Sequence, residues 1–145
     1  MNPMTSTPEI TDLQRRHLRI GWGSLLLFVV LGGVLEAMHG FKVDWYLSVG
    51  NETQRLLWRL AHAHGTFLSL VHIGLAVSVA HMAGSPPRLA SACLTSALIA
   101  LPGGFLLGAF GGHGGDPGLG ILLVPAGLIL LVVAIIAVLR SLRSA

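Results

Sequence analysis

The sequence predicts an all-α integral membrane protein, an up-and-down bundle of four transmembrane helices. Of its 145 residues, 53% are hydrophobic and only 10% are charged, whereas a soluble domain usually carries about 25% charged residues. Four apolar segments each reach the roughly 20 residues of helix that cross a hydrocarbon core. The connections between them are short, so neighbouring helices should pack antiparallel in a single domain.

The four expected helices are bounded by polar or glycine-rich stretches. They cover residues 20–39, 56–82, 89–110 and 118–139. Residues 1–14 contain prolines and acidic side chains, and we expect them to form a short mobile polar tail that is not a cleaved signal peptide. Hydrophobicity does not alternate with a period of two, which argues against a membrane barrel.

The distribution of arginine and lysine predicts the orientation of the bundle. Six of these residues lie on the side of both termini and three on the other side. Because cytoplasmic segments carry the excess of basic residues, both termini should be cytoplasmic, and we expect a bacterial inner (cytoplasmic) membrane. The lipid bilayer is the expected partner. Nucleic acid is not, because no basic cluster is interleaved with aromatic residues.

Two histidines, His62 and His64, lie in the second apolar segment. Positions two apart are separated by about 200° on a helix, so the pair cannot ligate one ion. The side of His62 carries small and polar residues, including Gly65, Ser69 and His72. Small residues are favoured where membrane helices meet, which places His62 in the core. The side of His64 is bulky and apolar, and we expect it to face lipid, another subunit or a large apolar cofactor.

Ionisable residues gather near the end of the bundle opposite the termini. Glu36 and His39 are three residues apart and therefore adjacent on one face of the first helix. His113 lies in the third connection, at a depth similar to that of His62. Ionisable groups at membrane depth are costly and commonly mark functional sites. We therefore predict that Glu36, His39, His62 and His113 are ligands of a metal ion.

Binding of a cofactor or metal ion is the leading functional hypothesis, with a redox or accessory role. Imidazole and carboxylate ligands suit copper, iron and zinc, and histidine is also the usual ligand of haem iron. For haem b, the candidate ligands are His62, His64 and His39. No hydrolase or phosphate-loop motif is present. The residue pattern does not decide whether the protein is an enzyme of another kind.

Two other hypotheses stay open. In the first, the chain is a structural or assembly subunit of a larger membrane complex or a homo-oligomer, and Glu36, Arg59 and His62 form a buried polar network. In the second, the chain is a proton- or ion-coupled transport component, with His72 near mid-membrane as a further step after Glu36 and His62. His17 is expected to be solvated at the membrane interface.

Overall fold

The computed structural model of the chain describes residues 11–79, 88–110 and 115–143. These residues form helices joined by turns, and none of them lies in a strand. The elements in chain order, with η for a 3-10 helix, are α1 (Asp12–Gly40), α2 (Asp44–Leu47), η1 (Val49–Asn51), α3 (Glu52–Val79), α4 (Arg88–Gly108), η2 (Leu119–Leu122) and α5 (Leu123–Arg143).

Four helices, α1, α3, α4 and α5, are long and apolar enough to cross a membrane, which confirms an all-helical fold with four candidate spans. They differ in how much of their surface the other helices cover. In the most apolar 18-residue stretch of each helix, 56% of α4 is buried by the rest of the protein, against 11% of α5. Helix α5 is also the most apolar of the four helices. Thus α4 is central, while α5 turns most of its apolar surface outward.

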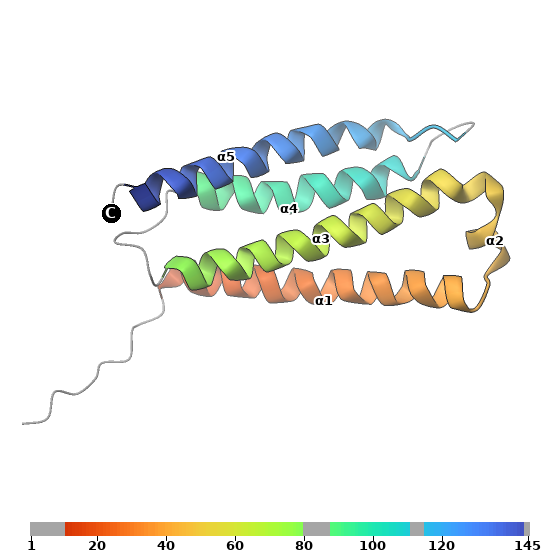
Figure 1. Ribbon diagram of the computed structural model, residues 1–145, viewed down its shortest axis with the longest axis horizontal. Helices are drawn as coiled ribbons and strands as arrows, with labels where there is room; N and C mark the ends of the chain where they lie inside the picture. The colour runs from red at the N-terminus through yellow and green to blue at the C-terminus, as the bar shows by residue number, and fades with distance from the viewer. Residues whose placement is uncertain (1–10, 80–87, 111–114, 144–145) are drawn as a thin grey trace, which may run out of the picture.

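The long helices run alternately up and down (Figure 1). Helix α1 packs on α3, α3 on α4 and α4 on α5, so α1 and α5 occupy opposite edges of the molecule. The start of α1 and the end of α5 lie at the same end of the molecule, which we call the terminal end. The opposite end, where α2 joins α1 to α3, is called the α2 end.

Helix α1 begins eight residues before the predicted start at residue 20, so residues 12–14 are helical and do not belong to a polar tail. A capping box fixes this start. The Thr11 hydroxyl accepts the backbone N–H of Gln14, and the Gln14 side chain accepts the backbone N–H of Thr11. These bonds satisfy groups that every helix N-terminus leaves open. The Gln14 amide also donates to the Ala76 carbonyl on α3, 3.3 Å away.

Small residues hold α1 against α3. A Cβ atom added at Gly21 would lie 3.0 Å from the Ser69 carbonyl oxygen, and one at Gly65 would collide with the Phe28 ring. Between these two contacts, the hydroxyl groups of Ser24 and Ser69 are hydrogen-bonded at 2.7 Å. The close approach follows the general preference of membrane helices for small residues at contacts.

Glycines also bring α4 and α5 together, and prolines lie in both helices. A Cβ atom added at Gly127 would lie 2.7 Å from the Leu101 backbone nitrogen. Pro102 is inside α4 and buried. Pro125 lies in the first turn of α5, where a helix needs no backbone N–H donor. A helix starting at residue 118 would hold Pro125 in its interior and bend there, but α5 starts at Leu123 and needs no such bend.

Candidate functional site

A groove between α1 and α3 opens at the α2 end. It encloses about 310 Å³ and is lined by polar side chains from both helices, together with small and apolar residues. Glu36 and His39 come from α1, and Arg59 and His62 come from α3. Three of the four predicted metal ligands therefore share one groove. The fourth, His113, lies outside the described residues.

His62 is the most closely held of these side chains. Its Nδ1 atom lies 2.7 Å from the Phe28 carbonyl oxygen on α1. Because a carbonyl only accepts, Nδ1 carries the hydrogen, so in the neutral imidazole the lone pair is on Nε2. The ring lies over Gly32, where an added Cβ atom would be 2.8 Å from Nε2. His62 thus faces α1, on the side where small residues predicted a helix contact.

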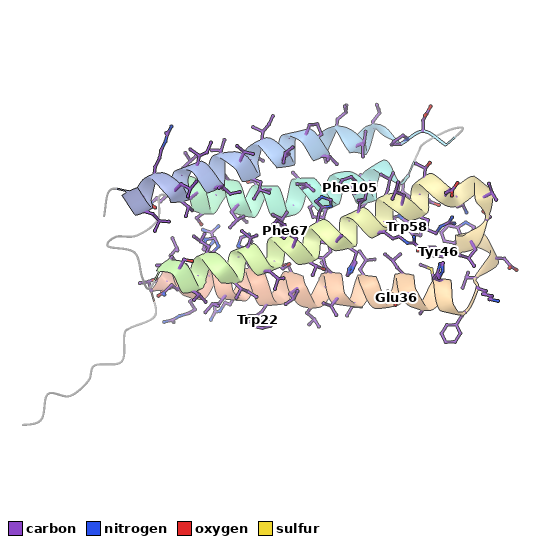
Figure 2. All side chains as sticks on the ribbon, in the orientation of Figure 1. Trp22, Glu36, Tyr46, Trp58, Phe67 and Phe105 are labelled. Atoms are coloured by element: carbon purple, nitrogen blue, oxygen red, sulfur yellow. The ribbon has the colours of Figure 1, made fainter. Side chains whose placement is uncertain are left out.

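Glu36, His39 and Arg59 are exposed. Nη2 of Arg59 lies 3.4 Å from Nδ1 of His39, a long contact between α3 and α1. Figure 2 shows Glu36 on α1, near the α2 end. The predicted buried network of Glu36, Arg59 and His62 is therefore wrong, since two of its three members are exposed. In Figure 1, the ribbon of α3 tilts away from that of α1 towards this end, which agrees with the exposure of Glu36, His39 and Arg59.

His64 points away from this groove. Its Nδ1 atom donates to the Leu60 carbonyl on the same helix, 2.8 Å away. Its ring packs against Phe105 of α4, with ring centroids 4.9 Å apart. His62 and His64 thus contact different helices, as their spacing predicted. His64 is half-buried, so part of its ring packs on α4 and the rest faces outward, on the side expected for lipid, another subunit or a large apolar cofactor.

A preformed metal cluster is absent from the described part of the chain. No three His, Cys, Asp or Glu side chains among residues 11–79, 88–110 and 115–143 are close enough together to hold an ion. Glu36, His39 and His62 share the groove, but their side chains do not converge on one point.

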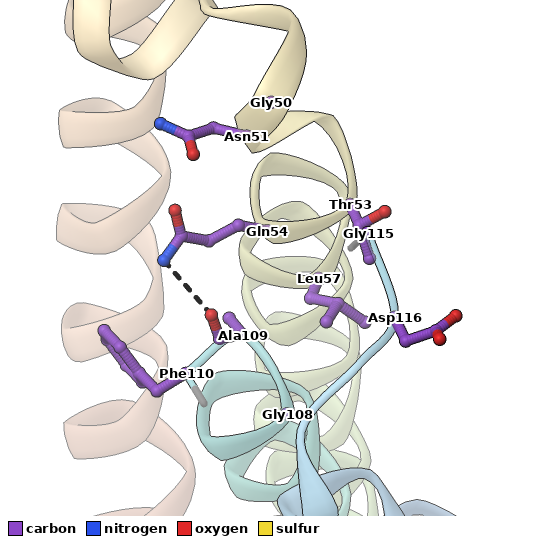
Figure 3. Close-up of a pocket in the computed structure, with 10 residues that line it drawn as sticks. All are labelled: Gly50, Asn51, Thr53, Gln54, Leu57, Gly108, Ala109, Phe110, Gly115 and Asp116. Atoms are coloured by element: carbon purple, nitrogen blue, oxygen red, sulfur yellow. Dashed lines mark hydrogen bonds between the residues drawn. The ribbon is translucent and has the colours of Figure 1, made fainter. Parts of the chain in front are cut away.

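A second polar cavity lies at the α2 end, between the start of α3 and the end of α4 (Figure 3). It encloses about 200 Å³, and Asn51, Thr53, Gln54 and Asp116 are among the residues that line it. The Gln54 amide donates to the Ala109 carbonyl at 3.1 Å, which ties α3 to the residue after α4. This bond gives a donor to one of the carbonyl groups that have no partner within the helix at the end of α4.

Sequence reasoning missed a buried histidine pair at the terminal end. His17 on α1 and His72 on α3 are both 0% exposed, and their Nδ1 atoms lie 2.8 Å apart. Nε2 of His17 lies 2.8 Å from the Ser91 hydroxyl on α4. His17 is therefore not solvated at an interface, and His72 lies towards the terminal end of α3. The capping box of α1 was the available signal, because it places His17 on the helix face of Gly21 and Phe28.

Comparison of the chain with protein-family models, with curated proteins and with solved structures finds no match.

Proposed function

We propose that the protein is an integral membrane protein that binds a transition-metal ion in the groove between α1 and α3. The observation that carries this proposal is the hydrogen bond from His62 Nδ1 to the Phe28 carbonyl, 2.7 Å long. Histidines that ligate metals commonly donate their second ring nitrogen to a carbonyl or carboxylate, which fixes the tautomer and the ring orientation. Nε2 of His62, which has no hydrogen-bond partner among the described residues, is the first ligand.

Glu36 and His39 complete the coordination by turning into the groove. Both are exposed, and they are adjacent on one face of α1, so their side-chain torsions are free to change. His39 gives up only a 3.4 Å contact with Arg59. The Glu36 carboxylate offsets part of the ion's charge, and the Arg59 guanidinium attracts an anionic ligand on the same ion. Mixed imidazole and carboxylate ligands suit copper, iron or zinc.

The dimensions of the groove favour an ion over haem b. At about 310 Å³, the groove is at the small end of the range of ligand pockets, roughly 300–1,000 Å³. His62 and His64 cannot ligate one haem together, because His62 contacts α1 and His64 contacts α4. Of the three histidines considered for haem, only His62 and His39 line the groove.

In this proposal both termini are cytoplasmic and the groove faces the extracytoplasmic side of a bacterial inner membrane. The excess of arginine at the terminal end supports this orientation. Trp45, Tyr46 and Trp58, which form an aromatic cluster at the α2 end, suit the opposite interface. The apolar outer surface of α5 is left to lipid, a second copy of the chain or another membrane subunit.

The test is purification from membranes, followed by an absorption spectrum and metal analysis by mass spectrometry. We expect close to one transition-metal ion per chain, and His62→Ala should lower the occupancy about tenfold or more. His64→Ala is the matched control and should keep the ion, because its ring faces α4. Absence of both a metal and a Soret band would refute the proposal. So would equal loss of metal from the two variants.

A structural role for the groove has less support. Among the described residues, the contact between two side chains across the groove joins Arg59 and His39, and both are exposed. Exposed polar pairs of this kind contribute about 0.2–1 kcal/mol to stability. We expect the close glycine contacts between α1 and α3 nearer the terminal end to contribute more. Transport along Glu36, His62 and His72 meets a gap of about 15 Å between the two histidines, and the Phe28 ring packs against Gly65 within it.

A further inference from the structure

The buried polar cluster at the terminal end, formed by His17, His72 and Ser91, takes no part in the proposed metal site. It joins three helices, because each side chain comes from a different one. The two imidazole rings are nearly parallel, with an interplanar angle of 28° and centroids 4.9 Å apart. Nε2 of His72 is buried and makes no well-aligned hydrogen bond among the described residues, and the Leu94 backbone on α4 is a further polar neighbour of this imidazole.

Ser91 is the member of the cluster with some exposed surface, 4%, whereas His17 and His72 have none. An open cavity of about 440 Å³ at the terminal end is lined by Asp12, Leu13, Arg16, Arg88, Ser91 and Ala92. Ser91 therefore borders this cavity and also contacts Nε2 of His17. Nδ1 of His17 continues to Nδ1 of His72. The chain of contacts runs from the cavity to the interior and ends at His72.

We infer that Ser91, His17 and His72 form a proton relay that loads a proton from the aqueous phase at the terminal end onto His72. In the neutral cluster, the Ser91 hydroxyl donates to His17 Nε2, His17 Nδ1–H donates to His72 Nδ1, and His72 holds its own hydrogen on Nε2. Each contact is 2.8 Å long, which is within the usual range for a hydrogen bond.

The loading step moves three protons, each by one contact. Hydronium in the cavity gives a proton to the Ser91 oxygen, and Ser91 passes its own proton to Nε2 of His17. His17 passes the Nδ1 proton to Nδ1 of His72, which becomes an imidazolium. Ser91 and His17 end neutral, and water is the other product. The reverse sequence returns the proton to the cavity.

The relay ends inside the protein. Beyond His72 towards the α2 end lie the hydrogen-bonded hydroxyl groups of Ser24 and Ser69, and then the Phe28 ring packed on Gly65. The relay therefore exchanges a proton with one side only, and we expect no proton conduction across the membrane. Its occupancy is set by the aqueous phase at the terminal end.

The charges around the cluster determine how readily it loads. On α1, Arg16 opposes an added proton and Asp12 favours it, and on α4 Arg88 opposes it; all three line the cavity. On α3, the residues after His72 up to Val79 carry no charged side chain. Removing the carboxylate of Asp12 should therefore make loading less favourable, and removing the guanidinium of Arg16 should make it more favourable.

The test uses the full chain with ¹⁵N-labelled histidine in lipid nanodiscs. Nuclear magnetic resonance should detect a scalar coupling between the Nδ1 atoms of His17 and His72, and exchange of their imidazole protons with water. Ser91→Ala should slow this exchange about tenfold or more, because it removes the positioned donor. Ser91→Thr keeps the hydroxyl and should restore the exchange. Ser78→Ala, an exposed serine bonded only to its own helix, should change neither signal.

Two results would overturn the relay. The first is the absence of the coupling between the two histidines in the wild-type chain. The second is proton exchange that stays at the wild-type rate in Ser91→Ala while the coupling persists, since the persisting coupling shows that the variant has folded. Metal occupancy of the groove does not enter either measurement, so the relay and the proposed metal site are tested separately.

Discussion

Gly127→Ala is expected to lower the free energy of unfolding by about 3 kcal/mol, at the upper end of the usual range for overpacking. The added Cβ atom would lie 2.7 Å from the Leu101 backbone nitrogen and 2.9 Å from its Cα atom. These are backbone atoms of α4, so no side chain is able to turn away and make room. The two helices must separate, which also opens the neighbouring contact of Gly104 with Val124.

The measurement is unfolding of the purified protein by sodium dodecyl sulfate in mixed micelles, followed by circular dichroism and tryptophan fluorescence. Gly103→Ala is the matched control, because an added Cβ atom there meets nothing within 4 Å. It should change stability by less than about 1 kcal/mol, and in the stabilising direction, since alanine is the better helix former. Equal destabilisation by both changes would show that the α4–α5 contact does not limit stability.

The fold followed from simple physical constraints, and for this reason composition and segment length were enough to predict it. In a bilayer, a chain with few charges and four long apolar segments would have to satisfy its backbone hydrogen bonds within helices. The start of α1 was the main error. Arg15, Arg16 and Arg19 precede the predicted start at residue 20, but long basic side chains extend from within a helix towards water, so they do not mark its boundary. The Thr11–Gln14 capping box was the better signal for the boundary.

The sequence was enough to predict on which face of α3 each histidine lies, whereas it was not enough to predict that Glu36 is exposed. Helical spacing separates His62 from His64, and the small residues beside His62 predicted contact with another helix. Burial of Glu36 depends on how closely α1 and α3 approach at the α2 end, and that distance depends on contacts elsewhere along the pair. The tight contacts at Gly21, Gly32 and Gly65 lie closer to the terminal end than Glu36 does.

The pairing of His17 with His72 could not be read from either helix alone. Each residue shares a face with small residues, but their meeting depends on the register between α1 and α3. Register is set by shape, here by the Phe28 ring against Gly65 and by the hydroxyl pair of Ser24 and Ser69. Once one of these contacts is known, antiparallel packing determines which other residues of α1 and α3 lie opposite each other.

Gly32→Ala is expected to disturb the proposed metal site without altering any ligand. The added Cβ atom would lie 2.7 Å from Nδ1 and 2.8 Å from Nε2 of His62, so the ring has to move off Gly32. The ring then loses its 2.7 Å hydrogen bond to the Phe28 carbonyl. Loss of a partly buried bond together with overpacking should lower stability by about 2 kcal/mol. Metal occupancy should fall about tenfold, which is the usual effect of removing a group that hydrogen-bonds to a metal-ligating side chain.

Gly33→Ala makes the same chemical change one residue later, where an added Cβ atom meets nothing within 4 Å. It should leave both the stability and the metal occupancy close to those of the wild-type chain. The two variants therefore separate the position of the His62 ring from the helix propensity of α1. If Gly32→Ala lowers stability but keeps full occupancy, the orientation of His62 does not matter for the ion, and the ligand set must be assigned to other side chains of the groove.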